Sequence, residues 1–469
     1  MSSHQRSEGP GCYRCDLLSC SCGICTIVFM ENSNRLTWQG CSVLLDINDG
    51  ERVVFARLSA AATLKIGKQN YSLRPIIGCP FGSLFRVENG KDGPYLIRVV
   101  PNEVGLGNNI QDGENEQVED GEELKDNRAL VDNNTAQSLT GDDIDEMRRQ
   151  GATGGQIVEA LIAHSTTFEK KTSFSQEKYR LRKQKKYAPT VLVRRPFARS
   201  ICDAYFRKVP TKIGCLRSDS LSLLLSLANV TAHSDVLVVD MVSGIVTGAV
   251  AERLGGFGYI CNTHLGVAPY PMDIVRIFNF SDDICKRIVR CCLNDLCPAQ
   301  NGSHVKAQNV VTVVENQPDI IEEDASTEEN KALVDTSSKT TNKNSMNSKS
   351  INAGEIASEE LITSWKEKGF SSLIVAAPEL DVWSILQKLL PHLSYSASFA
   401  IYHQYLQPLA ICMHNLQKEK LALGLQISEP WLREYQVLPS RTHPRMQMSA
   451  CGGYILSGIK TCSNQPDIQ

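Results

Sequence analysis

A short loop after a run of buried-strand residues carries part of the pattern that binds a nucleotide or S-adenosylmethionine. The segment Val236-Leu237-Val238-Val239 leads into Asp240-Met241-Val242-Ser243-Gly244-Ile245-Val246. In such a loop the acidic residue is followed by glycines at every second position, so that the backbone can approach the ligand. Asp240 and Gly244 match this pattern, but Val242 and Val246 stand where the outer glycines belong. Branched side chains there would fill the cofactor's space and resist the required backbone angles.

A second requirement of the same kind of site also fails. A carboxylate after the second strand usually holds the ribose of the ligand. In this chain the second strand ends Cys261-Asn262-Thr263-His264, which contains no carboxylate. We therefore expect no bound cofactor, with Asp240, Val242, Gly244 and Val246 forming a degenerate loop. Taken alone, the pattern fits an unrelated α/β loop equally well.

A strongly basic segment offers different chemistry. The whole chain has a net charge of −3, yet residues 168–212 contain 14 Lys/Arg against 3 Asp/Glu, a net of +11. Such cations neutralise phosphates, and the interleaved Phe174, Tyr179 and Tyr187 could stack on unpaired bases. The candidate RNA contacts are Lys170, Lys171, Lys178, Arg180, Arg182, Lys183, Lys185, Lys186, Arg194 and Arg195. A solvated basic face or a nuclear-import signal would have the same composition, and we expect a nuclear protein.

Alternating strands and helices must position these residues. Buried strands are predicted at 236–240, 259–261, 373–376 and 396–402, helices at 221–227, 243–254, 271–297, 356–368, 380–390 and to about 418, and closing strands around 434–438 and 453–456. This alternation is typical of a doubly wound sheet. We therefore predict a Rossmann-like α/β domain of the methyltransferase type over 191–462.

The flanking segments differ in composition. Residues 30–100 alternate in the β manner around the turn Asn48-Asp49-Gly50, which predicts a small barrel-like domain and an α+β fold overall. Residues 101–146, with 14 Asp/Glu against 2 Lys/Arg, are expected to be an acidic linker before a helix and basic arm over 147–190. No aromatic residue occurs from 281 to 364, so 299–355 is predicted to be a disordered insertion inside the α/β domain. Residues 1–29 and 463–469 are expected to lie outside the domains.

The seventeen cysteines are interpreted as reduced thiols. Cys12, Cys15, Cys20, Cys22 and Cys25 are spaced too closely for a two-lobed zinc site, so no metal is expected. Cys285, Cys291, Cys292 and Cys297 are predicted to be buried on one helical segment. No apolar run reaches 18 residues, so we expect an intracellular protein without a membrane span.

Several segments together carry a family resemblance. They are 44–50, 78–82, Ser165-Thr166-Thr167-Phe168, 174–179, 431–439, Arg441-Thr442-His443-Pro444 and 452–458. In combination they resemble the non-catalytic subunit of the eukaryotic tRNA N1-methyladenosine methyltransferase. The likeness spans about Met30 to Lys460 and implies that Met30 is near the family's usual start. Cys451 departs from it, because a glycine-rich run is usual at that point.

The resemblance implies a partner and a division of labour. The family pairs with a catalytic paralogue, which binds S-adenosylmethionine, as a heterotetramer of two plus two subunits that methylates the T-loop adenosine of tRNA. The catalytic relative has Leu-Asp-x-Pro at its fourth strand; here Val375-Ala376-Ala377-Pro378 has alanine in place of the acid, so acid–base chemistry is not expected. The basic residues above would then contact tRNA, and the resemblance adds Arg441, His443 and Arg445 near the tRNA or a composite active site.

Two other functions remain open at this stage. One is an active S-adenosylmethionine-dependent RNA methyltransferase with an unorthodox loop, against which Val242, Val246 and Ala376 argue. The other is an RNA-binding scaffold, for example in translation, with no methyltransferase partner. A cofactor titration tests the first, and co-purification of a glycine-intact paralogue would exclude the second.

Overall fold

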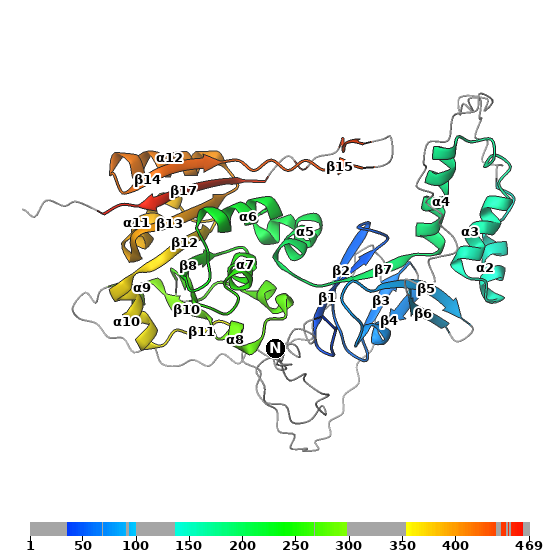
Figure 1. Cartoon of the computed structure of the whole chain (residues 1–469), viewed down its shortest axis with the longest axis horizontal. Helices are drawn as coiled ribbons and strands as arrows, with labels where there is room; N and C mark the ends of the chain where they lie inside the picture. The colour runs from blue at the N-terminus through cyan, green and yellow to red at the C-terminus, as the bar shows by residue number, and fades with distance from the viewer. Residues whose placement is uncertain are drawn as a thin grey trace, which may run out of the picture.

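The fold consists of two β-sheets and a small helical module (Figure 1). The computed structural model describes residues 35–99, 137–297 and 353–462, apart from 68, 91, 92, 267, 438–441, 447, 448, 450 and 451. The predictions for 1–29, for 463–469 and for most of the acidic linker and the insertion lie outside the described residues. The mixed fold class predicted from the sequence is confirmed by the strand order of the two sheets.

The N-terminal domain is an antiparallel sheet of order β2-β1-β7-β5-β6. Its strands are β1 (Ser42–Ile47), β2 (Arg52–Arg57), β5 (Leu84–Gly90), β6 (Gly93–Arg98) and β7 (Thr190–Arg194). Asn48, Asp49 and Gly50 all have positive φ, which Asn, Asp and Gly tolerate better than other residues, so the predicted turn forms between β1 and β2. A separate hairpin of β3 (Thr63–Ile66) and β4 (Gln69–Ser72) contacts β6, so the domain resembles a barrel without one continuous ladder.

Strand β7 lies in the centre of this N-terminal sheet, paired with β1 and β5. The sequence interpretation began the α/β domain at residue 191, so it placed most of β7 in the wrong sheet. The three apolar residues Val191, Leu192 and Val193 suffice to predict a strand, but a run that short carries no information about its partner strands.

The helical module is formed by α2 (Gly141–Arg149), α3 (Gly154–Ala163) and α4 (Ser173–Tyr187), and it lies at the far end of the N-terminal sheet from the large sheet (Figure 1). Its core contains Ile144, Ile157 and Leu161. The predicted acidic linker therefore ends before 141, not at 146. Thr140 and Asp143 form a capping box, so acidic residues that looked like a linker belong to the first turn of a helix.

The larger sheet has the order β11-β10-β9-β8-β12-β13-β17-β14 and is parallel except for the last two strands, which run antiparallel to their neighbours. The strands are β8 (Asp235–Asp240), β9 (Tyr259–His264), β10 (Ile288–Cys292), β11 (Glu355–Ile356), β12 (Phe370–Ala376), β13 (Leu393–His403), β14 (Ala422–Ser428) and β17 (Tyr454–Lys460). The strand order reverses at β8 and β12, as in doubly wound folds that bind ligands at this point.

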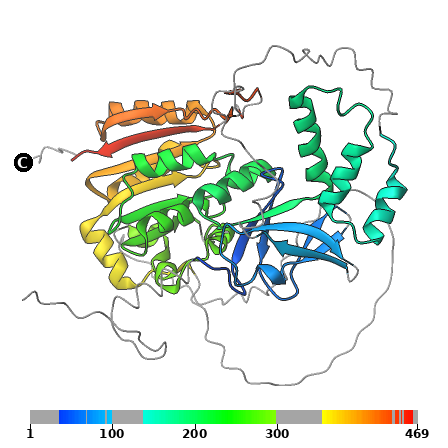
Figure 2. The same ribbon diagram turned by 45° about the vertical axis from the view of Figure 1, so that its right-hand side comes forward.

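Helices cover both faces of this sheet, as Figure 2 shows from a second direction. One face packs against α5 (Ala198–Lys208), α6 (Ser218–Leu227), α7 (Ile245–Leu254) and the 3₁₀ helix η5 (Asp273–Phe278). The other packs against α9 (Leu293–Leu296), α10 (Glu359–Lys368), α11 (Val382–Leu389) and α12 (Leu406–Lys418). Because both faces are covered, the central strand β8 is buried over Val236–Asp240.

Two predictions for this domain were wrong. Residues 271–297 are not one helix, because they contain η5, a short helix α8 (Asp282–Cys285), strand β10 and α9. The closing strand is not at 434–438 but is β14, and β15 (Tyr435–Gln436) pairs only with β16 (His443–Pro444) outside the sheet. In the first case short apolar runs fit a helix and a strand equally well, whereas in the second the residues do form a strand whose partner no local pattern indicates. Residue 355, which was assigned to the insertion, starts β11.

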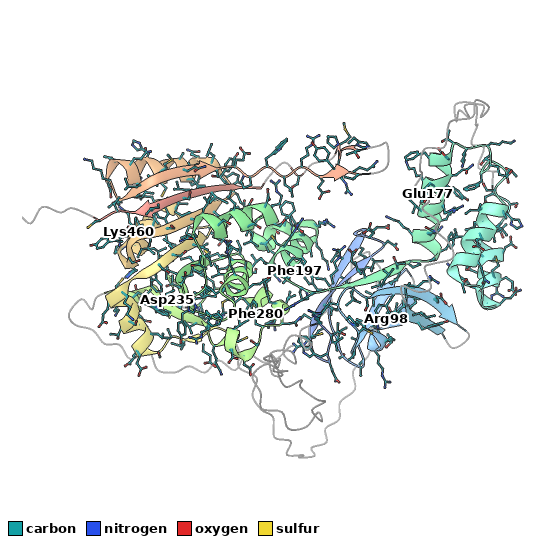
Figure 3. All side chains as sticks on the ribbon, in the orientation of Figure 1. Arg98, Glu177, Phe197, Asp235, Phe280 and Lys460 are labelled. Atoms are coloured by element: carbon teal, nitrogen blue, oxygen red, sulfur yellow. The ribbon has the colours of Figure 1, made fainter. Side chains whose placement is uncertain are left out.

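A side-chain clamp joins the two domains. The Asn279 side chain accepts a hydrogen bond from the Ser42 backbone N–H at 2.7 Å and donates one to the Ser42 carbonyl at 2.8 Å. The Phe55 and Tyr205 rings lie 4.8 Å apart across the same junction. Figure 3 labels Phe197, which follows β7 where the chain enters the large domain, and Phe280, which adjoins Asn279 in the sequence. These contacts fix the helical module relative to the large sheet through the N-terminal domain.

Candidate functional site

The Asp240 carboxylate closes the loop where a cofactor would bind. Its Oδ1 accepts hydrogen bonds from the backbone N–H groups of Val242 at 2.9 Å and Gly244 at 3.1 Å. Its Oδ2 accepts from the backbone N–H and the hydroxyl of Thr247, both at 2.8 Å. Asp240 is fully buried, and burial raises its pKa, while these four hydrogen bonds act in the opposite direction. The carboxylate is therefore used to hold its own loop.

The space over this loop is filled by protein atoms. Val242 and Val246 are fully buried in the core of this face. Gly244 has a φ of 86°, and a Cβ at that position would lie 2.8 Å from the Met272 Cα and 3.1 Å from Val275. The Ser243 carbonyl accepts the Ile274 N–H at 3.1 Å, which holds the start of η5 against the loop. The described residues therefore do not fit S-adenosylmethionine at this position.

Asn262, which stands after the second strand, has a structural role. Its side-chain amide donates to the Thr247 hydroxyl at 3.0 Å and contacts the Met272 sulfur at 2.9 Å. The side chain is buried, so these contacts connect β9, α7 and the segment before η5 in one network. The amide nitrogen of Asn262 is thus committed to contacts within the protein, and the residue offers no carboxylate that could hold a ribose.

The alanine at the end of the fourth parallel strand is equally enclosed. Ala376 has no exposed surface and packs in the same core as Ala400 and Tyr402. Its carbonyl accepts the Met241 N–H at 2.9 Å. An acidic side chain at this position would lie among apolar atoms, so the site lacks both the acid and the room for it.

The basic candidates on α4 fall on two different sides of the helix. Lys178, Arg182 and Lys185 share one face by their i, i+4, i+7 spacing, and Lys186 lies beside them. These four side chains and Arg180 are exposed, as is Lys170 before the helix. None of the four pairs with a carboxylate among the described residues. We call Lys178, Arg182, Lys185 and Lys186 the α4 basic stripe.

Lys183 differs from the stripe. Its ammonium lies 5.2 Å from the Tyr179 ring centroid and 5.9 Å from that of Tyr187, and Lys171 covers Tyr179 at 5.1 Å. Burial, together with Lys186 and Arg182, lowers the pKa of Lys183. The sequence interpretation treated all these lysines alike, but Lys183 and Lys171 are half-buried against aromatic rings. Tyr179 and Tyr187 accordingly have cation partners within the helical module.

Arg194 and Arg195 lie at the domain junction, away from α4. Arg194 forms an ion pair at 2.5 Å with Asp46, whose carboxylate is buried and also accepts the Gly50 N–H. Arg195 lines a cavity of about 400 Å³ with Phe197, Glu252 and Phe280. Burial raises the pKa of Glu252, and the Ala198 N–H and Arg195 oppose that rise. Both arginines thus have structural partners.

His443 and Arg445 lie on the hairpin of β15 and β16, and Arg441 is outside the described residues. Arg445 pairs with Glu434 at 3.2 Å, and the His443 Nδ1 lies 2.9 Å from the Pro444 carbonyl. In both views this end of the hairpin points toward α4 (Figures 1 and 2). The exposed cations of α4 and the described candidates of the hairpin therefore lie on two separate projections, and the structure does not gather the candidate residues in one pocket.

Arg217 anchors the base of this hairpin, and the sequence interpretation did not identify it. Its guanidinium forms two hydrogen bonds with Asp219, at 2.6 and 2.8 Å, and donates to the carbonyls of Pro430 at 2.9 Å and Ser449 at 3.0 Å. Those carbonyls belong to the two limbs of the hairpin. Gly452 packs on the guanidinium so closely that a Cβ would lie 2.7 Å from it. Arg217 is nearly buried, so this is a positioning contact.

The cysteine prediction needs correction. Of the four cysteines assigned to a helix, only Cys291 is buried, and it lies on strand β10; Cys285 and Cys292 are half-buried and Cys297 is exposed. No cluster of His, Cys, Asp or Glu within the described ranges could hold a metal ion. The N-terminal cysteines lie outside those ranges. Nor does any helix in the described part of the chain have the length and apolarity to cross a membrane.

The chain is similar to a known family and to named proteins of other organisms. Residues 38–296 match the Gcd10p family. A Dictyostelium discoideum protein is 35% identical over 445 residues, covering 92% of this chain and 80% of its own length, and a Mus musculus protein is 29% identical over 89% of each chain. The chain belongs to the Gcd10p family. Both relatives are named tRNA (adenine(58)-N(1))-methyltransferase non-catalytic subunits, so the resemblance seen in the sequence is confirmed.

Solved structures give a weaker likeness. A SAM-dependent O-methyltransferase from Thermotoga maritima is 10% identical with a TM-score of 0.47, covering 92% of this chain and 96% of that one. A tRNA (m1A58) methyltransferase from Aquifex aeolicus is 12% identical with a TM-score of 0.43, covering 91% and 100%. The fold assignment for this Gcd10p family member accordingly rests on its own strand order.

Replacing Ala376 by Asp should destabilise the protein without creating activity. The new carboxylate would be buried with no donor arranged around it, which costs about 3–5 kcal/mol for an uncompensated buried charge. Chemical denaturation measures the loss, and Ala60→Asp at an exposed position is the control. A variant of unchanged stability would show that the end of β12 is open to solvent.

Replacing Arg217 by Ala should loosen the hairpin. Asp219 and two carbonyls lose a charged donor, and each such hydrogen bond is worth about 1.5–3 kcal/mol. Hydrogen–deuterium exchange should rise over 429–452, and urea denaturation should show the accompanying loss of stability. Arg445→Ala, which breaks only an exposed ion pair, should cost about 1 kcal/mol or less. Equal exchange in the two variants would contradict the anchoring role.

Proposed function

We propose that this Gcd10p family member is the non-catalytic, tRNA-binding subunit of the tRNA (adenine(58)-N(1))-methyltransferase complex. Its partner is the catalytic subunit, a paralogue that binds S-adenosylmethionine and performs the methyl transfer. The observation that carries the proposal is the contrast between a filled cofactor position and an exposed basic stripe on α4. The names of its relatives support the same function. An independently active methyltransferase is disfavoured, because Met272 and Val275 fill the space over the loop where the cofactor would bind.

The α4 basic stripe supports tRNA binding by simple electrostatics. Four cations on one exposed face can neutralise consecutive phosphates, and they are held on a rigid helix. Gln176 fixes the start of α4 by donating to the carbonyls of Phe168 and Lys171, both at 3.0 Å. Leu181 is exposed beside the stripe, and Phe174 lies on the same side of the helix. The arrangement offers phosphate contacts with an apolar border.

The hairpin supports assembly with a partner. Its exposed apolar side chains include Trp431 at 73%, Val437 at 75% and Met446 at 90% exposure, with Tyr435 at 55%. Apolar side chains gathered on a projecting element mark protein interfaces in soluble proteins. The hairpin therefore docks the catalytic subunit, and Arg217 sets its direction. His443 and Arg445 then lie beside that interface, facing tRNA from the second projection, and Arg441 is proposed as a third tRNA contact from its place in the sequence.

The assembly is a heterotetramer of two plus two subunits, and the complex acts in the nucleus. The basic run of α4 supports nuclear import as well as RNA binding, because short Lys/Arg runs serve both roles. Native mass spectrometry of the co-purified complex tests the stoichiometry. A mass corresponding to one copy of each chain would overturn the tetramer.

Changing Lys178, Arg182 and Lys185 together to Ala should weaken tRNA binding while leaving the complex assembled. Each lost phosphate contact lowers the magnitude of the salt slope by about 0.7–0.9, so the triple variant should lose roughly 2–3 in slope. Affinity is measured at several salt concentrations, and gel filtration of the same sample reports assembly.

The matched control changes Lys366, Lys368 and Lys418 to Ala, three exposed cations on α10 and α12. This control removes the same net charge without touching α4, so its slope should stay near that of the parent complex. An unchanged slope for the α4 variant would refute the RNA-binding role of the stripe. Dissociation of the partner would instead make α4 an assembly surface.

A further inference from the structure

A cavity of about 560 Å³ lies where the N-terminal sheet meets the helical module. One wall comes from the turn after β1, from the β3–β4 hairpin and from β5. The other wall comes from α2 and the end of α4. Its lining includes Arg52, Gln69, Tyr71, Arg148, Lys186 and Tyr187. Cavities that hold small ligands usually have volumes of about 300–1,000 Å³.

The cavity combines an apolar floor with a cationic rim. The floor contains the buried Ile47, Tyr71, Val87 and Pro189. Four cations line it, namely Arg52, Arg148, Lys185 and Lys186, against the two carboxylates of Glu51 and Asp145. An apolar floor suits the face of a base, and the cations suit a phosphate.

Some of the cations that line the cavity have no carboxylate partner among the described residues. Arg148 pairs with Asp145 at 3.0 Å, and Glu51 accepts a hydrogen bond from the Asn48 amide at 3.3 Å. Arg52 donates to the Lys65 carbonyl at 3.1 Å and has no carboxylate partner among the described residues, nor do Lys185 and Lys186. The uncompensated charge is therefore close to what one or two phosphodiesters carry, and the carboxylates can accept from a base or ribose.

Tyr187 is held by cations at the cavity wall. The Arg148 guanidinium lies 5.7 Å from its ring centroid and the Lys186 ammonium 5.2 Å from it. Such cation–π contacts restrict the ring and the guanidinium. Both groups present flat surfaces on which a base can stack.

The two walls are fixed to one another by Asn48. Its side-chain amide donates to the Lys185 carbonyl at 3.0 Å, and its side-chain oxygen accepts the Thr190 N–H at 3.2 Å. The Asn48 N–H also donates to the Thr190 carbonyl at 3.0 Å. The cavity is therefore preformed, which reduces the entropy cost of binding.

We propose that this cavity receives one unpaired nucleotide of the tRNA, stacked at Tyr187 and Arg148 with its phosphate among Arg52, Lys185 and Lys186. The proposal rests on the proposed tRNA-binding function and adds a second mode of contact to it. The α4 basic stripe shares Lys185 and Lys186 with the cavity rim, so a strand that follows the stripe reaches the cavity directly. The α4 basic stripe binds phosphates of any RNA strand, whereas the cavity accepts only a nucleotide that is unpaired and unstacked.

The test compares two fluorescein-labelled RNA duplexes that are identical except for one bulged adenosine. Fluorescence anisotropy is measured with the full chain co-purified with its catalytic subunit. Because stacking is worth about 1–3 kcal/mol per base, the bulged duplex should bind about 5- to 150-fold more tightly. Gln69→Trp, which fills the cavity, and Arg148→Leu should each abolish this preference, with affinity for the continuous duplex equal to that of the matched control variant.

Neighbouring residues outside the lining supply the controls. Asn70→Trp and Arg149→Leu introduce the same new side chains at the adjoining residues of β4 and α2 and should keep the preference. Equal affinity of the parent complex for both duplexes, or a preference that survives Gln69→Trp and Arg148→Leu, would overturn the proposal. Competition by free AMP at micromolar concentration would overturn it in favour of a free nucleotide.

The same anisotropy measurements distinguish the contribution of the α4 basic stripe to RNA binding from that of the cavity. Lys178→Ala with Arg182→Ala should weaken binding of both duplexes equally and keep their ratio. If this double variant binds both duplexes normally while Gln69→Trp removes the preference for the bulged duplex, the cavity proposal stands and the RNA-binding role of the stripe is refuted. If the double variant weakens binding but the parent complex binds both duplexes equally, the role of the stripe stands and the cavity proposal is refuted.

Discussion

The buried Asp240 carboxylate is the interaction on which the arrangement of the large sheet depends. It lies at the switch point between β8 and β12, where a doubly wound sheet normally opens to a ligand. Here the carboxylate accepts four hydrogen bonds from the loop and the first turn of α7. A buried charge is tolerated when it is satisfied in this way. The loop is thus stabilised by its own donors and needs no ligand to order it.

Filling the cofactor position has a structural benefit elsewhere. Met272 and η5 pack on the loop, and the Asn279 clamp that follows η5 binds β1 of the N-terminal domain. The segment that closes the cofactor position therefore also joins the two domains. The N-terminal sheet in turn holds the helical module through β7, which connects α4 to the large sheet. The closed cofactor position and the fixed placement of α4 are two consequences of one packing arrangement.

Much of the fold follows from residue patterns, and the exceptions have physical causes. The valines at 242 and 246 predicted a closed loop because side-chain volume is a local property, and the structure buries both. Strand β10 was missed because Ile288-Val289-Arg290-Cys291-Cys292 lacks the alternation of a half-buried strand. The sheet to which β7 belongs depends on pairing over more than a hundred residues, as in Leu44 with Arg194, which no local pattern records. The α4 cations were recognisable, but their orientation was not.

Orientation separates the exposed cations of α4 from those that support its packing. The spacing Tyr179, Lys183, Tyr187 puts an ammonium between two rings on the inner face, where burial lowers the pKa of Lys183. Lys178, Arg182 and Lys185, spaced i, i+4 and i+7, lie on a different face of the helix and remain exposed to water. In a helix with cations on both faces, the cations of one face can therefore pack against aromatic rings while those of the other face remain available to phosphates. The hairpin likewise combines a supporting residue with exposed ones. The buried Arg217 fixes its base, and its exposed apolar side chains remain available to a partner.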